Sequence, residues 1–294
     1  MQLTPNQLAA LSAVLSHGSF EAAAHALNVT PSAISQRIKA LEDRIGTVLV
    51  DRGQPCTGTA AGQRLAKHAE DVALLENQIA RELSLPPKGP AAQLRCAINA
   101  DSLATWFIPA MAACPDILFD LVIDDQDHSA DWLRRGDVSA AVTHGSKPVT
   151  GCDLFDLGAL RYVATASPAY MSRWFADGPN TATLRAAPCL VFNAKDALQR
   201  RWLEINAEPA LSPPAHFLPS SQAFVDAAKA GLGWGMNPLL LVEQELANGE
   251  LVEILPDTPL DVPLGWQVSR VMAAALEPVT RAVVATAAKY LIRD

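Results

Sequence analysis

The stretch that decides the fold runs from Ser19 to Arg52 and reads SFEAAAHALNVTPSAISQRIKALEDRIGTVLVDR. Its alanine-rich beginning, residues 21–27, predicts a short helix, and a tight turn follows it. Thr30 and Pro31 then predict the start of a second helix, because threonine is a good N-cap and proline suits the first helical position. The apolar stripe of this second helix consists of Ile34, Ile38, Leu41 and Ile45.

The opposite face of the second helix is polar. It carries Ser32, Ser35, Gln36 and Lys39. An α-helix fits the major groove of B-DNA, where Gln pairs with adenine edges, Ser with several edges and Lys with guanine or phosphate. Together with a predicted helix at residues 4–18, the pattern indicates a helix-turn-helix that reads double-stranded DNA. The alternative is a generic helical bundle.

The segment 47–57 predicts a β-hairpin wing, because two β-prone runs flank a turn. Arg52 lies at the edge of this wing and is placed to reach a DNA phosphate. An ion pair with Asp51 or Glu42 is the alternative role for Arg52. We therefore predict a winged helix-turn-helix domain over residues 1–58.

A long amphipathic helix is predicted from Thr59 to Leu83. Its narrow apolar stripe recurs at Leu65, Val72 and Ile79. A narrow stripe on a helix that leaves a small domain is typical of contact with a second copy of the same helix. We therefore predict dimerisation through these residues, with packing on the helix's own domain as the alternative. The helix breakers at 86–90 favour a hinge, so the dimerisation helix and hinge cover residues 59–90.

Composition and charge exclude several classes of protein. The 294 residues are 50% hydrophobic and 18% charged, enough to bury a sizeable core. The net charge of −8 argues against nonspecific nucleic-acid binding by the whole chain, yet residues 1–68 carry +2 and the remainder −10. No apolar run approaches the roughly 20 residues that a membrane helix needs, so we expect a cytoplasmic protein without a membrane partner.

Neither a cofactor nor a metal ion is expected. The five cysteines are scattered, without a CxxC pair or a cysteine–histidine cluster. The six histidines form no acid–base pattern, and P-loop, GxGxxG and GxSxG motifs are absent, which argues against an enzyme. A redox sensor is an alternative that would need a low-pKa exposed thiol at Cys152 or Cys189. The negative net charge of the whole chain also argues against a nonspecific architectural DNA-binding protein.

After residue 90, short apolar runs alternate with helical patterns. Strands at 94–98, 117–123 and 140–143, separated by helices, predict an α/β domain with a mainly parallel sheet. The alternation restarts near Arg161. We therefore expect two α/β units in this part of the chain.

The stretch quoted first, continued by Thr59 to Gly62, resembles the N-terminal signature of LysR-type transcriptional regulators. The runs RGQPCTGTAAGQRL (52–65) and INADSLATWFIPAM (98–111) further resemble the subgroup that senses arginine or lysine and controls basic-amino-acid exporters. Thr57 and Gly58 depart from that subgroup, which usually shows a basic residue and a proline in the wing.

The resemblance implies an effector-binding domain at 91–294 that is similar to periplasmic binding proteins. Its subdomain I would comprise 91–161 and 266–294, and its subdomain II would comprise 162–265. The resemblance also implies a homodimer or homotetramer that takes lysine or arginine as its effector. Such a regulator would activate an amino-acid exporter gene and would act on RNA polymerase indirectly.

Ligands of such α/β domains lie beyond the carboxyl ends of strands, where helix starts offer N–H groups to anions. Ser102 follows the first strand and Ser221 begins a helix of the second lobe, so we expect both to hold the effector's carboxylate. Ordinary helix capping is the alternative. Asp124 and Asp125 follow the strand at 117–123 and suit the effector's distal cation. The alternative for this acidic cluster is a solvated loop.

Overall fold

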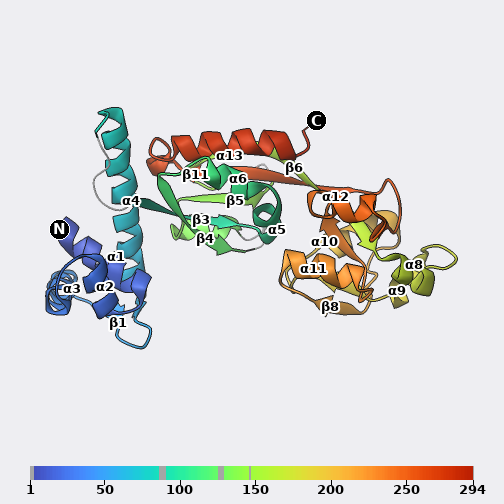
Figure 1. Cartoon of the computed structure of the whole chain (residues 1–294), viewed down its shortest axis with the longest axis horizontal. Helices are drawn as coiled ribbons and strands as arrows, with labels where there is room; N and C mark the ends of the chain where they lie inside the picture. The colour runs from blue at the N-terminus through green and yellow to red at the C-terminus, as the bar shows by residue number, and fades with distance from the viewer. Residues whose placement is uncertain (1–2, 86–90, 125–128, 146, 294) are drawn as a thin grey trace.

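The computed structural model describes residues 3–85, 91–124, 129–145 and 147–293. Figure 1 shows three parts in chain order: a small helical domain, a long helix, and an α/β region drawn out into two lobes. The small domain consists of α1 (Pro5–His17), α2 (Phe20–Ala26), α3 (Pro31–Ile45) and a hairpin of β1 (Val50–Asp51) and β2 (Thr57–Gly58).

Caps and glycines set the ends of these helices. The Thr30 hydroxyl accepts a hydrogen bond from the N–H of Ala33 at the start of α3. Helices α1 and α3 end at Gly18 and Gly46, whose φ angles of 69° and 81° lie in the left-handed region that glycine adopts without strain. The predicted helix-turn-helix is confirmed. The wing strands are shorter than predicted, because the first begins only at Val50.

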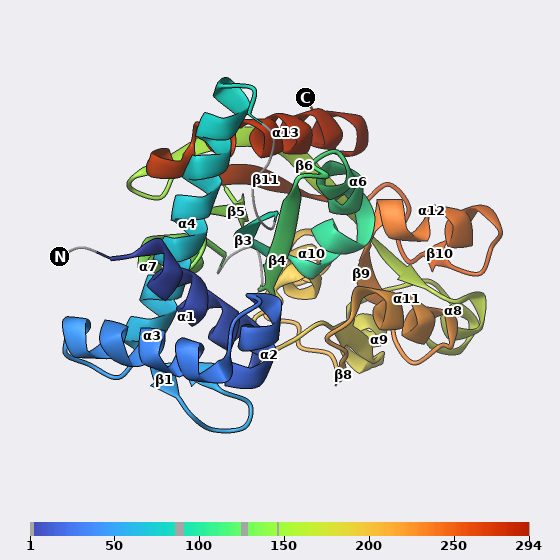
Figure 2. The ribbon, with the colours of Figure 1, turned by 60° about the vertical axis from the view of Figure 1, so that its left-hand side comes forward.

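Helix α4 (Ala60–Glu82) leaves the small domain and runs alongside the first lobe (Figures 1 and 2). Thr59 caps it, because its hydroxyl accepts a hydrogen bond from the N–H of Gly62. The helix thus joins the small domain to the α/β region as one continuous element.

The α/β region is built on a seven-stranded sheet in the order β10-β6-β11-β5-β3-β4, with β9 pairing β6. A small second sheet pairs β7 with β8. The strands are β3 (Ala92–Ile98), β4 (Ile117–Ile123), β5 (Ala140–His144), β6 (Cys152–Ala166), β7 (Cys189–Val191), β8 (Ala215–Phe217), β9 (Gly235–Pro238), β10 (Val252–Glu253) and β11 (Leu260–Ser269).

The expectation of a mainly parallel sheet is wrong. β3 pairs in parallel with β4 and β5, and β7 in parallel with β8, but the other pairings are antiparallel. The long strands β6 and β11 cause the difference, because they run antiparallel to each other from one lobe into the other (Figure 1). Arg161 and Asp261 face each other on these strands in a bidentate ion pair, with N–O distances of 2.8 and 2.7 Å.

Helices cover both lobes and confirm the two-subdomain α/β fold. The first lobe carries α5 (Ala100–Ser102), a π-helical turn η1 (Leu103–Phe107), α6 (Ile108–Ala112), α7 (Ser129–Arg135), the 3-10 turn η2 (Arg270–Met272) and α13 (Glu277–Tyr290). The second lobe carries α8 (Pro168–Trp174), α9 (Thr181–Ala186), α10 (Leu198–Asn206), α11 (Ser221–Lys229) and α12 (Leu239–Ala247).

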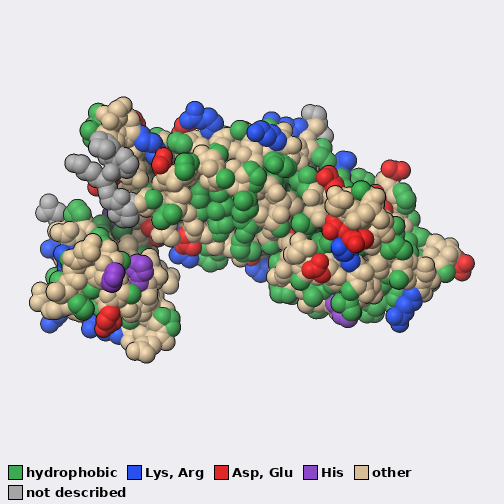
Figure 3. Space-filling view, in the orientation of Figure 1, with side chains coloured by type: hydrophobic (Ala, Val, Ile, Leu, Met, Phe, Trp, Pro, Cys, Tyr) green, Lys and Arg blue, Asp and Glu red, His purple; other side chains and the backbone are tan. Residues whose placement is uncertain are grey.

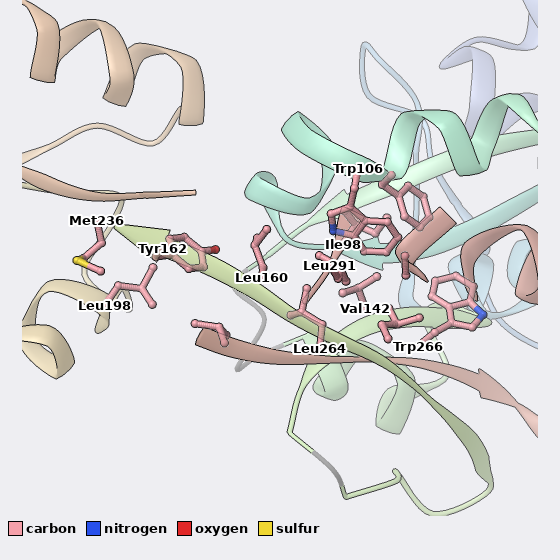
Figure 4. Packing of buried hydrophobic residues seen from close by; sticks show 14 of the residues in the cluster. Ile98, Trp106, Val142, Leu160, Tyr162, Leu198, Met236, Leu264, Trp266 and Leu291 are labelled. Carbon is pink, nitrogen blue, oxygen red and sulfur yellow. The ribbon is translucent and has the colours of Figure 1, made fainter. Parts of the chain in front are cut away.

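One hydrophobic cluster extends through both lobes. Figure 4 shows Leu198 and Met236 beside Tyr162 on one side, and Trp106 and Trp266 on the other, with the crossing strands between them. The core therefore continues across the crossover. Among the described residues, no helix combines the length and apolar character that a bilayer crossing requires.

Candidate functional sites

Helix α3 presents the predicted reading face to solvent. Ile34 and Ile38 are completely buried in the core of the small domain, which fixes the rotation of the helix. Ser32, Gln36 and Lys39 are consequently exposed on the outer side, and Ser35 is half-buried. Figure 3 shows Lys and Arg side chains along the side of this domain where Figure 1 places α3. A polar, basic and convex helix face of this kind fits a major groove.

Arg52 extends from the hairpin beside this face. Its guanidinium lies 3.9 Å from a Glu42 carboxylate oxygen and 5.2 Å from the centre of the Phe20 ring, yet its side chain is 59% exposed. The other oxygen of Glu42 accepts hydrogen bonds from the N–H groups of Leu49 and Val50. Glu42 therefore secures the base of the wing and orients Arg52, while leaving the cation accessible to a phosphate.

The predicted stripe on α4 has three different environments. Leu65 is half-buried and packs against the core of the small domain. Val72 is half-buried, and Ile79 is 52% exposed. Leu75 and Leu83 are also exposed near Ile79. The end of the helix farthest from the small domain thus carries the exposed apolar surface.

Another face of α4 packs on the first lobe of the same chain. Leu74 is buried in the lobe's core, and the Lys67 ammonium lies 2.5 Å from both an Asp71 oxygen and the Ser139 hydroxyl. The Ser139 hydroxyl donates in turn to Asp71 at 2.8 Å. Burial raises the pKa of the neighbouring Glu70, although the Lys67 and Arg95 cations lower it. Buried polar groups therefore connect the helix to the lobe.

A cavity that opens to solvent lies between the two lobes. Three aspartates and no Lys or Arg occur among the described residues that line it. Its polar lining comprises Asn99, Asp101 and Asp124 from the first lobe and Asp196, Ser221 and Asn237 from the second. Phe192, Leu198, Phe224 and Met236 supply apolar walls. This lining favours a small, positively charged ligand with an apolar part.

Asp124 is the predicted cation-binding residue that the structure places in this cavity. One of its carboxylate oxygens accepts a hydrogen bond from the Trp132 indole N–H at 2.9 Å. The other lies 3.0 Å from the Lys195 ammonium of the opposite lobe. The second predicted carboxylate, Asp125, lies outside the described residues.

The two predicted serines are placed differently. Ser221 lines the cavity, and its hydroxyl donates to an Asp101 oxygen at 2.7 Å across the lobes. Ser102 is completely buried and is not among the described residues that line the cavity. Its neighbour Asp101 faces the ligand space instead, because consecutive residues of a helix point in different directions. Tyr162 on β6 donates to the other Asp101 oxygen at 2.8 Å.

Asn237 supplies a further polar group that was not predicted. Its side chain is buried at 1% exposure, and its amide N–H donates to the Thr165 hydroxyl at 2.9 Å. Its carbonyl oxygen Oδ1 has no hydrogen-bond partner among the described residues. A buried acceptor without a donor costs free energy, so this atom is suited to a ligand that brings an N–H group.

Two families match the two parts of the chain. Residues 5–63 match the bacterial regulatory helix-turn-helix proteins of the lysR family, and residues 87–290 match the LysR substrate binding domain. The chain belongs to the LysR family of transcriptional regulators. This LysR-family protein is a DNA-binding regulator and not an enzyme.

Its similarity to individual LysR-family regulators extends over nearly the whole chain. It is 43% identical over 286 residues to the transcriptional regulator LysG of Mycobacterium tuberculosis, covering 97% of this chain and 94% of that one. It is 42% identical over 291 residues to ArgP of Pseudomonas aeruginosa, covering 97% and 96%. It is 39% identical over 295 residues to the lysine export regulatory protein LysG of Corynebacterium glutamicum, covering 98% and 99%.

Two solved structures support the same assignment. The crystal structure of ArgP from Mycobacterium tuberculosis matches with a TM-score of 0.77 and 43% identity, over 100% of both chains. Full-length LysG from Corynebacterium glutamicum, solved with bound effector Arg, matches with a TM-score of 0.66 and 37% identity, over 99% of this chain and 100% of that one.

The thiols of this LysR-family protein contradict the redox alternative. Cys152 and Cys189 are buried, and burial raises the pKa of both, that of Cys189 to about 12. A redox-sensing cysteine needs a lowered pKa and access to solvent. Neither thiol has these properties.

The sequence patterns missed the cavity residues whose role depends on tertiary contacts. Asp101 adjoins the predicted Ser102, and its acidic character at a helix start was the available signal. Tyr162 lies in β6, Asn237 in the short strand β9, which was not predicted, and Lys195 in a short loop. Their meeting in one cavity requires the lobes to be placed face to face, which no local pattern specifies.

Proposed function

We propose that this LysR-family protein binds operator DNA as a homodimer or homotetramer and activates a basic-amino-acid exporter gene when lysine or arginine occupies the cavity. Ser32, Ser35, Gln36 and Lys39 of α3 would contact base edges in the major groove. Arg52 would contact a phosphate beside them. The action on RNA polymerase would be indirect, and the protein would work in the cytoplasm, where the DNA is.

One observation carries the effector assignment: Asp124 projects a carboxylate, held by Trp132, into a cavity whose described charged lining is entirely acidic. The Lys195 ammonium pairs with Asp124, so a neutral ligand that took its place would remove this compensating charge from a partly desolvated site. The distal ammonium of lysine or guanidinium of arginine would pair with Asp124, and Asp125 is expected to add to this charge.

The other end of the amino acid has matching partners. Its α-ammonium would donate to Asp101 and to the Oδ1 atom of Asn237. Its α-carboxylate would accept from the Ser221 hydroxyl, which would turn away from Asp101 as the α-ammonium takes its place, and from backbone N–H groups at the start of α11. We also expect Ser102 to hold this carboxylate; its hydroxyl is completely buried and has no hydrogen-bond partner among the described residues. The carbon chain between the two ends would lie against the apolar walls.

The relatives support this proposal. Corynebacterium glutamicum LysG is described as a lysine export regulator and was solved with bound effector Arg. Oligomerisation through α4 would bring the exposed Ile79 end of the helix together with a second copy, with Val72 and Leu65 along the same stripe.

A thermal-shift screen of the full-length protein against the common amino acids tests the effector class. A ligand that binds only the folded state raises the melting temperature in a concentration-dependent way. We expect lysine or arginine to do so, and leucine, glutamate and glutamine not to. Stabilisation by an acidic or an apolar amino acid, with no response to either basic one, would contradict the proposal.

A further inference from the structure

Lys195 reaches from the second lobe to the carboxylate of Asp124 in the first. Its ammonium lies 3.0 Å from one Asp124 oxygen. Lys195 is not among the described residues that line the cavity, although Asp124 is. The chain's own lysine thus pairs with the carboxylate that the proposed function assigns to the effector's distal cation.

The loop that carries Lys195 has a fixed backbone. The Asp196 carboxylate accepts hydrogen bonds from the N–H groups of Phe192 and Leu198, each at 2.9 Å. The Asn193 side-chain oxygen accepts one from the N–H of Lys195 at 2.7 Å. The position of the Lys195 backbone is therefore set, and its four-carbon side chain is the part that can rotate.

The two partners of this ion pair differ in how easily they can leave it. The Lys195 side chain is 49% exposed, whereas that of Asp124 is 20% exposed. Trp132 also holds the second Asp124 oxygen. The ammonium can return to water at small cost, because ion pairs with a solvent-exposed lysine contribute little free energy. The carboxylate remains in place, so this is a site at which one cation can be exchanged for another.

We infer that Lys195 is an internal competitor of the effector: its ammonium occupies the cation position at Asp124 and must be displaced before the distal cation of lysine or arginine can bind. The inference rests on the proposed function, because it assumes that the effector's cation uses Asp124. Lys195 then sets the effector concentration at which the regulator responds. It also contributes to specificity, because a neutral side chain that displaced Lys195 would not replace the positive charge that it removes from Asp124.

Calorimetric titration of the full-length protein tests this inference. Lys195→Met keeps an unbranched side chain of similar length and removes the charge. We expect the Kd values for lysine and arginine to fall by the same factor, about two- to five-fold, because either ligand would no longer have to break the internal pair. Lys195→Arg keeps the charge and should not increase affinity. Lys289→Met removes an equal charge from α13 and should leave both Kd values unchanged.

A double variant separates the direct contact from general charge effects. In the Asp124→Asn background, Lys195→Met should have no further effect on the Kd, because the ion pair is already lost. An unchanged or increased Kd in Lys195→Met alone would overturn the inference and indicate a support between the lobes or a contact to the effector's carboxylate. A gain that persists in the double variant would also overturn it.

The two proposals fail in different ways. Tight binding of arginine or lysine by the wild type, with no gain in Lys195→Met, refutes the internal competitor and leaves the effector assignment standing. Binding of a basic amino acid by Lys195→Met but not by the wild type would support both. If neither protein binds a basic amino acid, the effector assignment is wrong and the inference falls with it.

Discussion

The indole N–H of Trp132 donates a hydrogen bond to Asp124 at 2.9 Å, so helix α7 orients the carboxylate at the centre of the proposed effector site. The carbonyl of Gly136, just after the end of the same helix, accepts a hydrogen bond from Arg64 of α4. Figure 2 shows α7 next to α4. Helix α7 and the glycine that follows it thus contact both Asp124 of the inter-lobe cavity and the helix that leads to the DNA-binding domain.

Asp124→Asn should weaken lysine or arginine binding by about 1–3 kcal/mol, because the amide keeps the shape of the side chain but loses the charge that pairs with the ligand. Calorimetry on the full-length protein measures the change. Asp131→Asn is a matched control on the exposed surface of α7, where Asp131 pairs with Arg134, and it should have no effect. If wild type and Asp124→Asn bind lysine and arginine with equal affinity, Asp124 does not contact the effector's cation.

Gln36 on α3 and Arg52 on the wing are expected to make different kinds of DNA contact, to a base edge and to a phosphate. Gln36→Ala should reduce discrimination at one base pair by roughly 1–3 kcal/mol, because the lost hydrogen bonds are to a base edge. Arg52→Ala should weaken binding to all sequences alike and reduce the dependence of affinity on salt. Binding assays with a selected operator and its single-base variants at several salt concentrations measure both. A sequence-independent loss in Gln36→Ala would remove its base-reading role.

Ile79 offers a clean test of dimerisation through α4. Because its side chain is 52% exposed in the single chain, Ile79→Glu should leave the fold of one protomer intact. In a dimer the new carboxylate would be buried without a partner, so we expect weaker self-association in analytical ultracentrifugation. Gln63→Glu adds the same charge at an exposed position of α4 and serves as the control. If Ile79→Glu self-associates as strongly as the wild type, the apolar stripe of α4 is not part of the interface.

Glu70 is expected to make the stability of the folded protein depend on pH. Its pKa is raised above the ordinary value of 4.5 by burial at the contact between α4 and the first lobe. The folded state therefore holds its proton more tightly than the unfolded state, and this contribution to stability is lost as the pH rises from about 4.5 through the raised pKa. Glu70→Gln should consequently raise the Tm at pH 7, and the gain should shrink towards pH 4. A Tm difference that does not change with pH would contradict this reasoning.

Local patterns predicted the DNA-binding domain well because its elements are determined by nearby residues. The cap at Thr30 and the stripe of Ile34 and Ile38 both act within a few turns of helix. The α/β region depends more on distant partners. β6 begins at Cys152, nine residues before Arg161, near which the alternation was expected to restart, because it pairs with β11 along both lobes. Helix α8 was missed, although Pro168 occupies a first-turn position that proline favours.

The effector cavity illustrates the limit of sequence patterns. Asp124 was predicted from its position after a strand, which is a local property. Lys195, its ion-pair partner, is 71 residues away, and the hydrogen bond between Asp101 and Ser221 spans 120 residues. Ser102 and Asp101 are adjacent, and only the rotation of the helix in the packed structure determines which of them faces the ligand. The chemistry of the site is visible in the sequence, but the convergence of its residues comes from the fold.

The charge of the effector's distal group is the central claim, and arginine and citrulline test it most directly. The two molecules have nearly the same shape, but citrulline carries a neutral ureido group in place of the guanidinium. Calorimetric titration of the full-length protein should show arginine binding at one site per protomer and citrulline binding at least about tenfold more weakly, a difference of about 1.4 kcal/mol. Equal affinity for arginine and citrulline would contradict the account, because the Asp124 carboxylate would then play no part in recognising the ligand's charge.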